Sequence, residues 1–101
     1  MKIKFVGIAV LWRDKVNGNT YHSVQIHDCE TGKVYYCPFE YGYGDQYRHT
    51  ALKAMVEFHL LPEKYNSNNC YLYEMENDYP ISWVCNHSTK RDCVENGKNP
   101  N

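Results

Sequence analysis

Residues 5–12 read FVGIAVLW, a run that is apolar at both odd and even positions. A strand with one face in water alternates polar and apolar residues, so this run predicts a central strand, over residues 3–13, that is covered on both faces. Gly7 inside the run indicates a bulge or a close approach to the backbone. The run is much shorter than the roughly 20 apolar residues of a transmembrane helix, so we expect neither a membrane span nor a membrane partner.

Turn residues divide the next part of the chain into two further strands. Asn17-Gly18 favours a type I′ hairpin turn, because both residues accept positive φ. Thr20–Cys29 then alternates polar and apolar residues, as a half-buried strand does. A second turn at residues 30–33 leads to a third strand, Val34–Phe39, in which Pro38 indicates an edge position or the end of the strand. These residues predict a three-stranded antiparallel meander.

One substantial helix is predicted over Gln46–Leu60. Asp45 is a suitable N-cap and Pro62 a suitable stop. Residues 66–69 then form a polar connector. The residues at helical spacing that we expect to face the sheet are Tyr47, Ala51, Ala54, Met55 and Phe58.

The last part of the chain predicts two strands and a short helix. Cys70–Met75 and Ile81–Cys85 have the character of strands. The spacing in Thr89-Lys90-Arg91-Asp92 is that of a capping box, which predicts a helix over Lys90–Asn96 that Gly97 ends.

Together these elements predict one α+β domain over residues 1–97, with a frayed tail at 98–101. Its sheet is expected to be antiparallel, with about five strands in the chain order strand-strand-strand-helix-strand-strand-helix, and to pack on one main helix.

Charge and cysteine content narrow the class of protein. Lys and Arg number 11 against 12 Asp and Glu, and this balance excludes a dedicated duplex-DNA binder, which carries a basic excess. The 5 cysteines include no close CxxC pair, so we expect free thiols in a reducing cytoplasm, with no metal and no other cofactor. No cleavage site follows the apolar run, so we expect no signal peptide.

No catalytic motif stands out in the sequence. Asp45 and His49 lie four residues apart on the predicted helix, but a carboxylate in the first turn more simply stabilises the helix. A domain of this size also has little room for a closed pocket. We therefore expect a protein that is not an enzyme and has no catalytic residues.

A first candidate for binding a partner is an aromatic loop. Tyr41, Tyr43 and Tyr47 cluster beside glycines, with Asp45 among them. Exposed rings of this kind fill a partner's pocket or stack on bases. The alternative is that they close one end of the core.

A second candidate is an acidic strand edge. Glu74, Glu76 and Asp78 alternate along the chain, and no Lys or Arg lies between Tyr65 and Thr89. On one strand face, the three carboxylates would attract a basic protein groove. The alternative is a solvated edge that its charge protects from aggregation.

Two strings carry a resemblance to a known group of proteins. NGNTYHSV at residues 17–24 and PFEYGYGDQY at residues 38–47, followed by Thr50-Ala51, resemble small accessory proteins encoded by bacteriophages and prophages. The resemblance covers roughly residues 1–60. It implies the cytoplasm of an infected bacterium and stoichiometric binding to a host enzyme or defence complex, as in anti-CRISPR inhibitors. It assigns no role to any residue.

The expectation from the sequence is therefore a small, non-enzymatic binding protein whose partner is a host or defence-system protein. The alternative is a protein that binds single-stranded nucleic acid by stacking bases on tyrosines. The oligomeric state stays open, with a homodimer among the alternatives.

Overall fold

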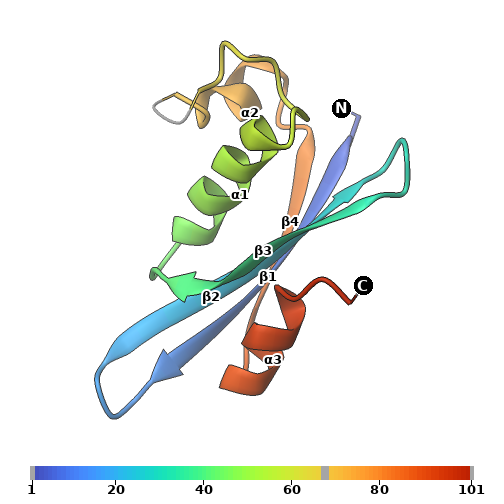
Figure 1. Ribbon diagram of the computed structural model, residues 1–101. Coiled ribbons are helices and arrows are strands. Elements are labelled where there is room, and N and C mark those ends of the chain that lie inside the picture. Colours follow the sequence, from blue (N-terminus) through green and yellow to red (C-terminus); the bar gives the residue numbers. More distant parts are fainter. Residues whose placement is uncertain (1, 67–68, 101) are drawn as a thin grey trace.

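The computed structural model describes residues 2–66 and 69–100 and shows a four-stranded sheet with helices on both faces (Figure 1). The strands lie in the order β3-β2-β1-β4, and they are β1 (Phe5–Asp14), β2 (Asn19–Asp28), β3 (Val34–Tyr41) and β4 (Ile81–His87). The helices are α1 (Gln46–Glu57), α2 (Leu72–Glu76) and α3 (Lys90–Asn96). The α+β class is therefore confirmed. Residues 67–68 of the expected connector and residue 101 of the expected tail lie outside the described residues.

β1 is the central strand that the apolar run predicted. It pairs antiparallel with β2 and parallel with β4. Phe5 and Leu11 are buried on the side of α1, and Val10 is buried on the side of α3. Gly7 marks a close approach, as expected, because a Cβ atom there would lie 2.5 Å from the ring of Trp83.

Both hairpins are closed in the same way, by an aspartate at the end of one strand and a glycine four residues later. Gly18 N–H donates to the Asp14 carbonyl at 2.7 Å, and Gly32 N–H donates to the Asp28 carbonyl at 2.8 Å. Each aspartate side chain also accepts from backbone N–H groups of its turn. The two-residue type I′ turn expected at Asn17-Gly18 is wrong. The Asp14 side chain organises a longer turn, in which Gly18 has a φ of 74° and Asn17 does not take positive φ.

β3 lies at an edge of the sheet, as Pro38 predicted, because a proline has no N–H to donate to a neighbouring strand. The register with β2 shifts between Val24, paired with Cys37, and His22, paired with Glu40. This shift is a bulge that places one extra β3 residue beside β2.

The segment Cys70–Met75, expected to be a strand, instead forms a turn at residues 70–71 and then the first residues of α2. Cys70 and Tyr73 are both buried, and their separation of three residues is helical rather than strand spacing. The chain then turns through Asp78 and Tyr79, which both have positive φ, into β4. Because β4 returns after two helices and runs parallel to β1, the expected five-stranded antiparallel sheet is wrong: the sheet has four strands and is mixed.

α1 begins where predicted but ends at Glu57 rather than at Leu60. His59, with a φ of 61°, ends the helix in a Schellman motif. Its N–H donates to the Val56 carbonyl at 3.0 Å, and the Leu60 N–H donates to the Met55 carbonyl at 2.8 Å. The helix therefore ends before the proline that was expected to stop it.

The two longer helices start differently. Asp45 occupies the N-cap position of α1, but its side chain makes no capping hydrogen bond, so the expected cap is absent. Thr89 Oγ1 accepts from the Asp92 N–H at 3.1 Å, and α3 has the predicted bounds. Gly97 follows α3 with a φ of −94°, and the reason for glycine there is space, since a Cβ would lie 2.5 Å from the Cys37 carbonyl oxygen.

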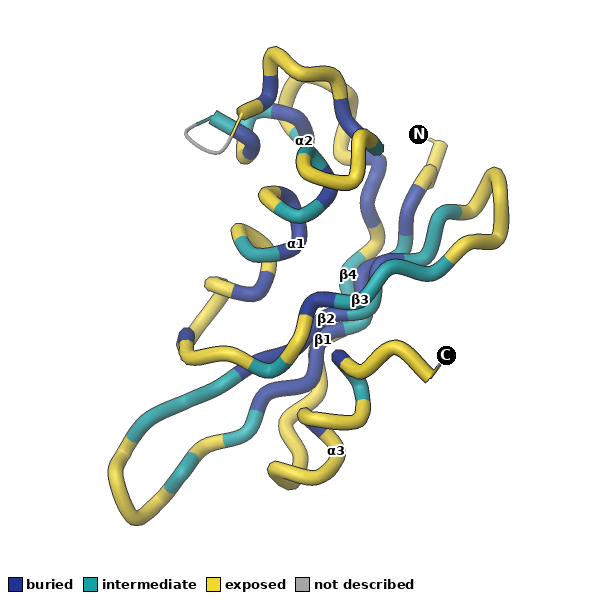
Figure 2. The backbone as a smooth tube through the Cα atoms, viewed as in Figure 1, coloured by how far each residue is buried: buried dark blue, intermediate teal, exposed yellow. Residues whose placement is uncertain are grey.

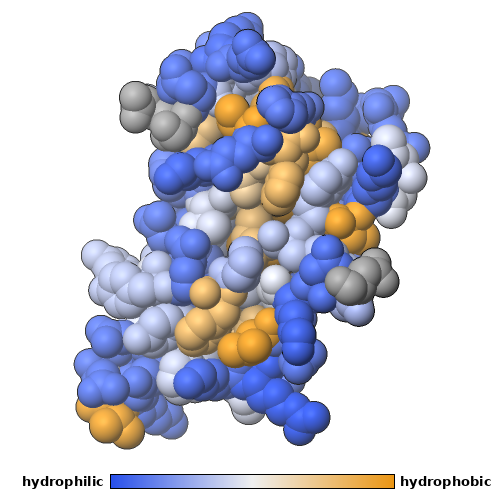
Figure 3. All heavy atoms as spheres, viewed as in Figure 1, coloured by the Kyte–Doolittle hydropathy of each residue, from blue (hydrophilic) through white to orange (hydrophobic). Residues whose placement is uncertain are grey.

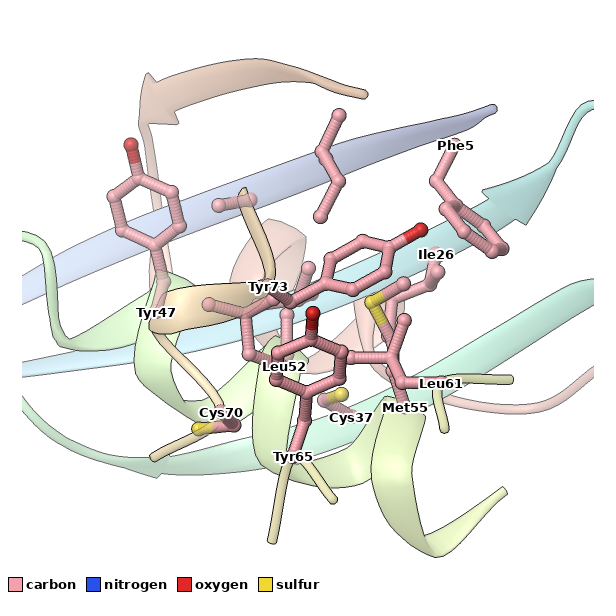
Figure 4. Close-up of a cluster of buried hydrophobic side chains, with 14 of the residues drawn as sticks. Phe5, Ile26, Cys37, Tyr47, Leu52, Met55, Leu61, Tyr65, Cys70 and Tyr73 are labelled. Atoms are coloured by element: carbon pink, nitrogen blue, oxygen red, sulfur yellow. The ribbon is translucent and has the colours of Figure 1, made fainter. Parts of the chain in front are cut away.

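The main core fills the space between the sheet and helices α1 and α2, where the buried backbone segments face one another (Figure 2). Figure 4 shows Phe5 and Ile26 of the sheet in one cluster with Met55 of α1 and Tyr73 of α2. Phe58 faces the sheet as expected, with its ring 5.0 Å from that of Tyr35 on β3, but its side chain is 41% exposed. The buried members of the expected helix face are Tyr47, Ala51 and Met55.

α3 docks onto the middle of the opposite face, where several hydrogen bonds hold it. The Ser23 hydroxyl donates to the Cys93 carbonyl at 2.5 Å, and the Cys93 thiol donates to the Val10 carbonyl at 3.2 Å. The Asn96 amide donates to the Ile8 carbonyl at 3.1 Å. The hairpin of β1 and β2 projects beyond this helix (Figure 1).

Candidate binding surface

Four aromatic side chains from three strands gather on the α3 side of the sheet, next to the turn between β1 and β2. Trp12 and Tyr21 are register partners, and their ring centroids lie 5.5 Å apart. The Tyr21 and Phe39 rings are stacked, with centroids 4.9 Å apart and planes at 10°. Tyr41 meets the edge of Tyr21 at 5.9 Å. We call these four residues the aromatic face.

Strand geometry explains why these rings share a side. Trp12 lies two positions beyond Val10, and side chains two apart on a strand point to the same face. Phe39 and Tyr41 are also two apart; Phe39 lies within the bulge of β3, between Cys37 and Glu40, and Tyr41 follows it. Tyr41 is 57% exposed, and the other three rings are half-buried. The aromatic face is therefore a surface, although its rings support one another.

Charged groups flank the aromatic face. The Lys90 ammonium lies 5.6 Å from the Trp12 ring centroid. A hydrogen bond from the Asn17 side chain, with smaller contributions from turn N–H groups and the charge of Lys90, lowers the pKa of Asp14. The cation beside the rings thus has an anion close to it.

A buried histidine anchors the glycine loop that follows Tyr41. His22 Nδ1 lies 3.2 Å from the Gly42 carbonyl oxygen, and Nε2 lies 2.8 Å from Thr50 Oγ1. Since a carbonyl oxygen only accepts, Nδ1 donates a proton to Gly42, and in a neutral ring Nε2 accepts from the threonine hydroxyl. A Cβ on residue 42 would lie 2.6 Å from the histidine ring. His22 therefore joins β2, the loop and α1 and fixes where β3 ends.

The structure divides the predicted aromatic loop. Tyr41 belongs to the aromatic face, and Tyr43, 70% exposed, lies in the connection to α1 with the exposed Asp45. Tyr47 is only 7% exposed and meets the Trp83 ring edge-on at 5.8 Å. Tyr47 thus follows the alternative in which a ring closes the core.

The predicted acidic strand edge does not form, because its residues lie in and after α2. Glu74 Oε1 accepts from the Trp83 indole N–H at 2.8 Å. Glu76 Oε1 accepts from the Tyr65 hydroxyl at 2.6 Å. Asp78 has a φ of 57° in the turn that leads to β4. Two of the three carboxylates therefore hold α2 to its neighbours rather than forming a shared face.

Four of the five cysteines have thiols with a raised pKa, and they are Cys37, Cys70, Cys85 and Cys93. Burial raises the pKa of the Cys37 thiol to about 12, and it also raises the pKa values of Cys85 and Cys93. A thiol with a raised pKa stays protonated at neutral pH, and the thiolate is the form that attacks substrates and binds zinc. Cys85 lines a hollow of about 520 Å³ together with Asp45 and His87. Among the described residues, no group of three or more His, Cys, Asp and Glu side chains could hold a metal ion.

Trp12, Tyr21 and Phe39 were missed as surface residues. A two-residue turn at Asn17-Gly18 would pair Trp12 with Ser23, whereas the longer turn of the structure pairs Trp12 with Tyr21. The contact with Phe39 depends on the bulge in β3, which the sequence did not place.

Comparisons with known proteins do not assign a family or a function to this chain. No protein-family model matches the chain, and neither the curated proteins nor the solved structures include a significant match. In the described part of the chain, no helix is both long enough and apolar enough to cross a membrane.

Proposed function

We propose that this chain is a non-enzymatic binding protein that acts by stoichiometric binding to a host protein, with the aromatic face as its contact surface. A counter-defence inhibitor such as an anti-CRISPR is the role that we favour. The observation that carries the proposal is the set of four contacting rings beyond the edge of α3. Tyr and Trp are enriched at protein interfaces and in their energetic hot spots.

The way these rings are held supports a binding role. They project from paired strands and stack on one another, so few side-chain rotations remain to be lost on binding. Tyr43 on the following connection is more exposed and adds an adaptable contact. The raised pKa values of the Cys37, Cys85 and Cys93 thiols support a role without nucleophilic catalysis.

The test compares two tyrosines of equal exposure. Tyr41 and Tyr71 are each 57% exposed, and Tyr41 alone of the two belongs to the aromatic face. Immobilised wild-type protein, Tyr41→Ala and Tyr71→Ala are incubated with a panel of bacterial lysates, and the retained proteins are quantified by mass spectrometry. We expect at least one lysate protein to be retained by wild type and by Tyr71→Ala. The retained amount of this protein should be lower by about tenfold or more with Tyr41→Ala, which corresponds to the loss of a hot-spot residue.

A retained protein is then purified and titrated against the wild-type chain by calorimetry. We expect saturation at a fixed stoichiometry and weaker binding with Tyr41→Ala. Equal retention of every protein by all three chains would contradict the proposal that the aromatic face is the contact surface.

A second candidate function is binding of single-stranded nucleic acid, which the stacked rings and Lys90 favour, since bases stack on aromatic side chains beside cations. Three observations weigh against it. The chain has a net charge of −1, and Asp14 lies close enough to Lys90 for the cation to influence its pKa. Rings that stack on each other also use faces that bases would need.

Fluorescence anisotropy with labelled single-stranded DNA and RNA separates the two functions. Nucleic-acid binding would weaken as salt is raised, because phosphate contacts release counterions. We expect no binding at physiological salt. If the chain binds nucleic acid in a salt-dependent way and Tyr41→Ala abolishes this binding, the partner is a nucleic acid and not a protein.

A further inference from the structure

The two edges of the sheet differ in how they are protected. β3 carries Pro38, a bulge and the charged Glu40, all of which discourage pairing with another strand. β4 reads ISWVCNH, with no proline and no Asp, Glu, Lys or Arg, and its register with β1 runs without a shift. Its side chains from Val84 to His87 are all exposed. β4 is therefore an open edge without the usual devices that block strand pairing.

The hydrogen bonds to β1 show which backbone groups of β4 point outward. Phe5 N–H donates to the Pro80 carbonyl at 3.2 Å, and Ser88 N–H donates to the Leu11 carbonyl at 2.8 Å. Even-numbered residues of this stretch thus point their backbone groups toward β1, and odd-numbered residues point theirs away. In the described part of the chain no strand pairs with this outer side. The residues with outward N–H and C=O groups are Ile81, Trp83, Cys85 and His87.

We propose that β4 binds β4 of a second copy of this chain, in antiparallel direction, about a two-fold axis through Val84. In this register Trp83 lies opposite the partner's Cys85, and Ile81 lies opposite the partner's His87. Every outward N–H and C=O group of the two strands then has a partner, because such residues form the hydrogen-bonded pairs of an antiparallel ladder. The two four-stranded sheets become one continuous sheet.

Several features favour a second copy over a different protein. A two-fold register about Val84 brings the outward residues of one copy opposite those of the other, so the strand can pair with itself over its whole length. No like charges meet, since the stretch between Asp78 and Lys90 is uncharged when His87 is neutral. The Val84 side chain is 43% exposed, and at the two-fold axis it packs against Val84 of the second copy. In the dimer the two β3 strands form the outer edges of the continuous sheet. Because β3 is protected against strand pairing, no further copy adds and the assembly stops at two copies.

The first test removes one outward N–H. Cys85→Pro deletes a donor on the open side and no hydrogen bond to β1, so it is compatible with an edge strand. Cys85→Ser is the matched control, because it removes the thiol and keeps the N–H. In sedimentation velocity of the whole chain under reducing conditions, we expect wild type and Cys85→Ser to pass from one chain to two as concentration rises, while Cys85→Pro stays at one.

The second test determines the register of the two β4 strands and does not require the proline variant to fold. In a chain carrying Cys29→Ser and Cys85→Ser, which removes the exposed thiols, Val84→Cys places two thiols across the axis in a non-hydrogen-bonded pair. We expect mild oxidation to give a covalent dimer. Ser82→Cys in the same background is the control, because residue 82 lies opposite the partner's Asn86.

Each outcome bears on the proposal. A wild-type chain that stays monomeric at every concentration overturns it, and so does a folded Cys85→Pro that dimerises as wild type does. Crosslinking of Ser82→Cys at the same yield as Val84→Cys overturns the register through Val84. Selective crosslinking of Val84→Cys supports the proposal even if Cys85→Pro fails to fold.

Discussion

Gly7 and Gly32 show two physical reasons for glycine at a given position. A Cβ at Gly7 would meet the Trp83 ring at 2.5 Å, whereas no atom lies within 4 Å of the Cβ position at Gly32. Gly32 instead has a φ of 77°, which side chains rarely adopt. The first position is constrained by packing, and the second by its backbone conformation.

We expect Gly7→Ala to lower the free energy of unfolding by about 1–3 kcal/mol, since the new methyl group must displace a packed ring. Gly32→Ala should cost about 1 kcal/mol, through backbone strain alone. Urea unfolding measures both, and near-ultraviolet circular dichroism reports the tryptophan environment, which should change only with Gly7→Ala. Equal losses with an unchanged tryptophan signal would contradict the packing explanation.

Asp14 gives a prediction for acid stability. The hydrogen bond from Asn17 is the largest cause that lowers the folded pKa of Asp14, which therefore lies below the unfolded value of about 3.9. A pKa that is lower in the folded state stabilises the protein at every pH above the pKa of the unfolded state. This stabilisation is lost as the pH falls to the pKa of the folded state. We expect the difference in unfolding free energy between wild type and Asp14→Asn to shrink below about pH 4. Denaturant unfolding across pH measures it, and a constant difference down to the folded pKa, located by NMR, would contradict the assignment.

At the scale of elements, the sequence predicted those strands and helices whose formation depends on residues close to one another in the chain. The apolar run gave β1, alternation gave β2, and the Thr89–Asp92 spacing gave α3 with its bounds. α2 was missed because the burial of Cys70 and Tyr73 depends on a core that other elements build. The parallel pairing of β4 was also out of reach, since its partner β1 lies at the far end of the chain.

The candidate surface follows the same rule. Exposure of Tyr41 and Tyr43 in a glycine-rich segment could be predicted from local sequence. Their relation to Trp12 and Phe39 required the register of three strands and the position of a bulge. Tyr47 lies at the helical spacing that predicted burial, and that signal outweighed its closeness to the loop.

Glu74 tests how α2 is held to β4. Glu74→Ala leaves the Trp83 indole N–H without its acceptor, so we expect the free energy of unfolding to fall by about 1–2 kcal/mol. Glu74→Gln keeps an acceptor oxygen and should retain most of the stability. Thermal unfolding followed by tryptophan fluorescence measures both variants. If the acidic residues formed a free surface instead, neither replacement would change the melting temperature.

At the scale of the whole molecule, the two proposed surfaces are separate. The four rings of the aromatic face lie on β1, β2 and β3, whereas the open edge of β4 faces away from these strands. A dimer through β4 would therefore leave the aromatic face of each copy free. Two free faces would let a dimer bind a repeated or dimeric target through both copies, which raises its overall affinity.

Stability and binding should separate when a surface ring and a core side chain are each truncated. Tyr43→Ala should change the free energy of unfolding by less than about 0.5 kcal/mol because the side chain is 70% exposed, and it should weaken binding of the partner. Leu52→Ala, at a position 2% exposed, should cost about 2–5 kcal/mol while the folded protein keeps its affinity. Melting temperature and calorimetric affinity measure the two effects. If Tyr43→Ala lowers the melting temperature as much as Leu52→Ala, the ring is structural and Tyr43 does not belong to the binding surface.

The parallel pairing of β1 with β4 has a consequence for synthesis on the ribosome. β1 is made first, and β2 and β3 follow it at once, so both hairpins can close while translation continues. The other side of β1 must wait until residues 81–87 have left the ribosome. During that interval a nascent chain displays an apolar strand with one unpaired edge, the kind of edge that pairs with wrong partners. A translational pause between β3 and β4 prolongs this exposure, and emergence of β4 ends it.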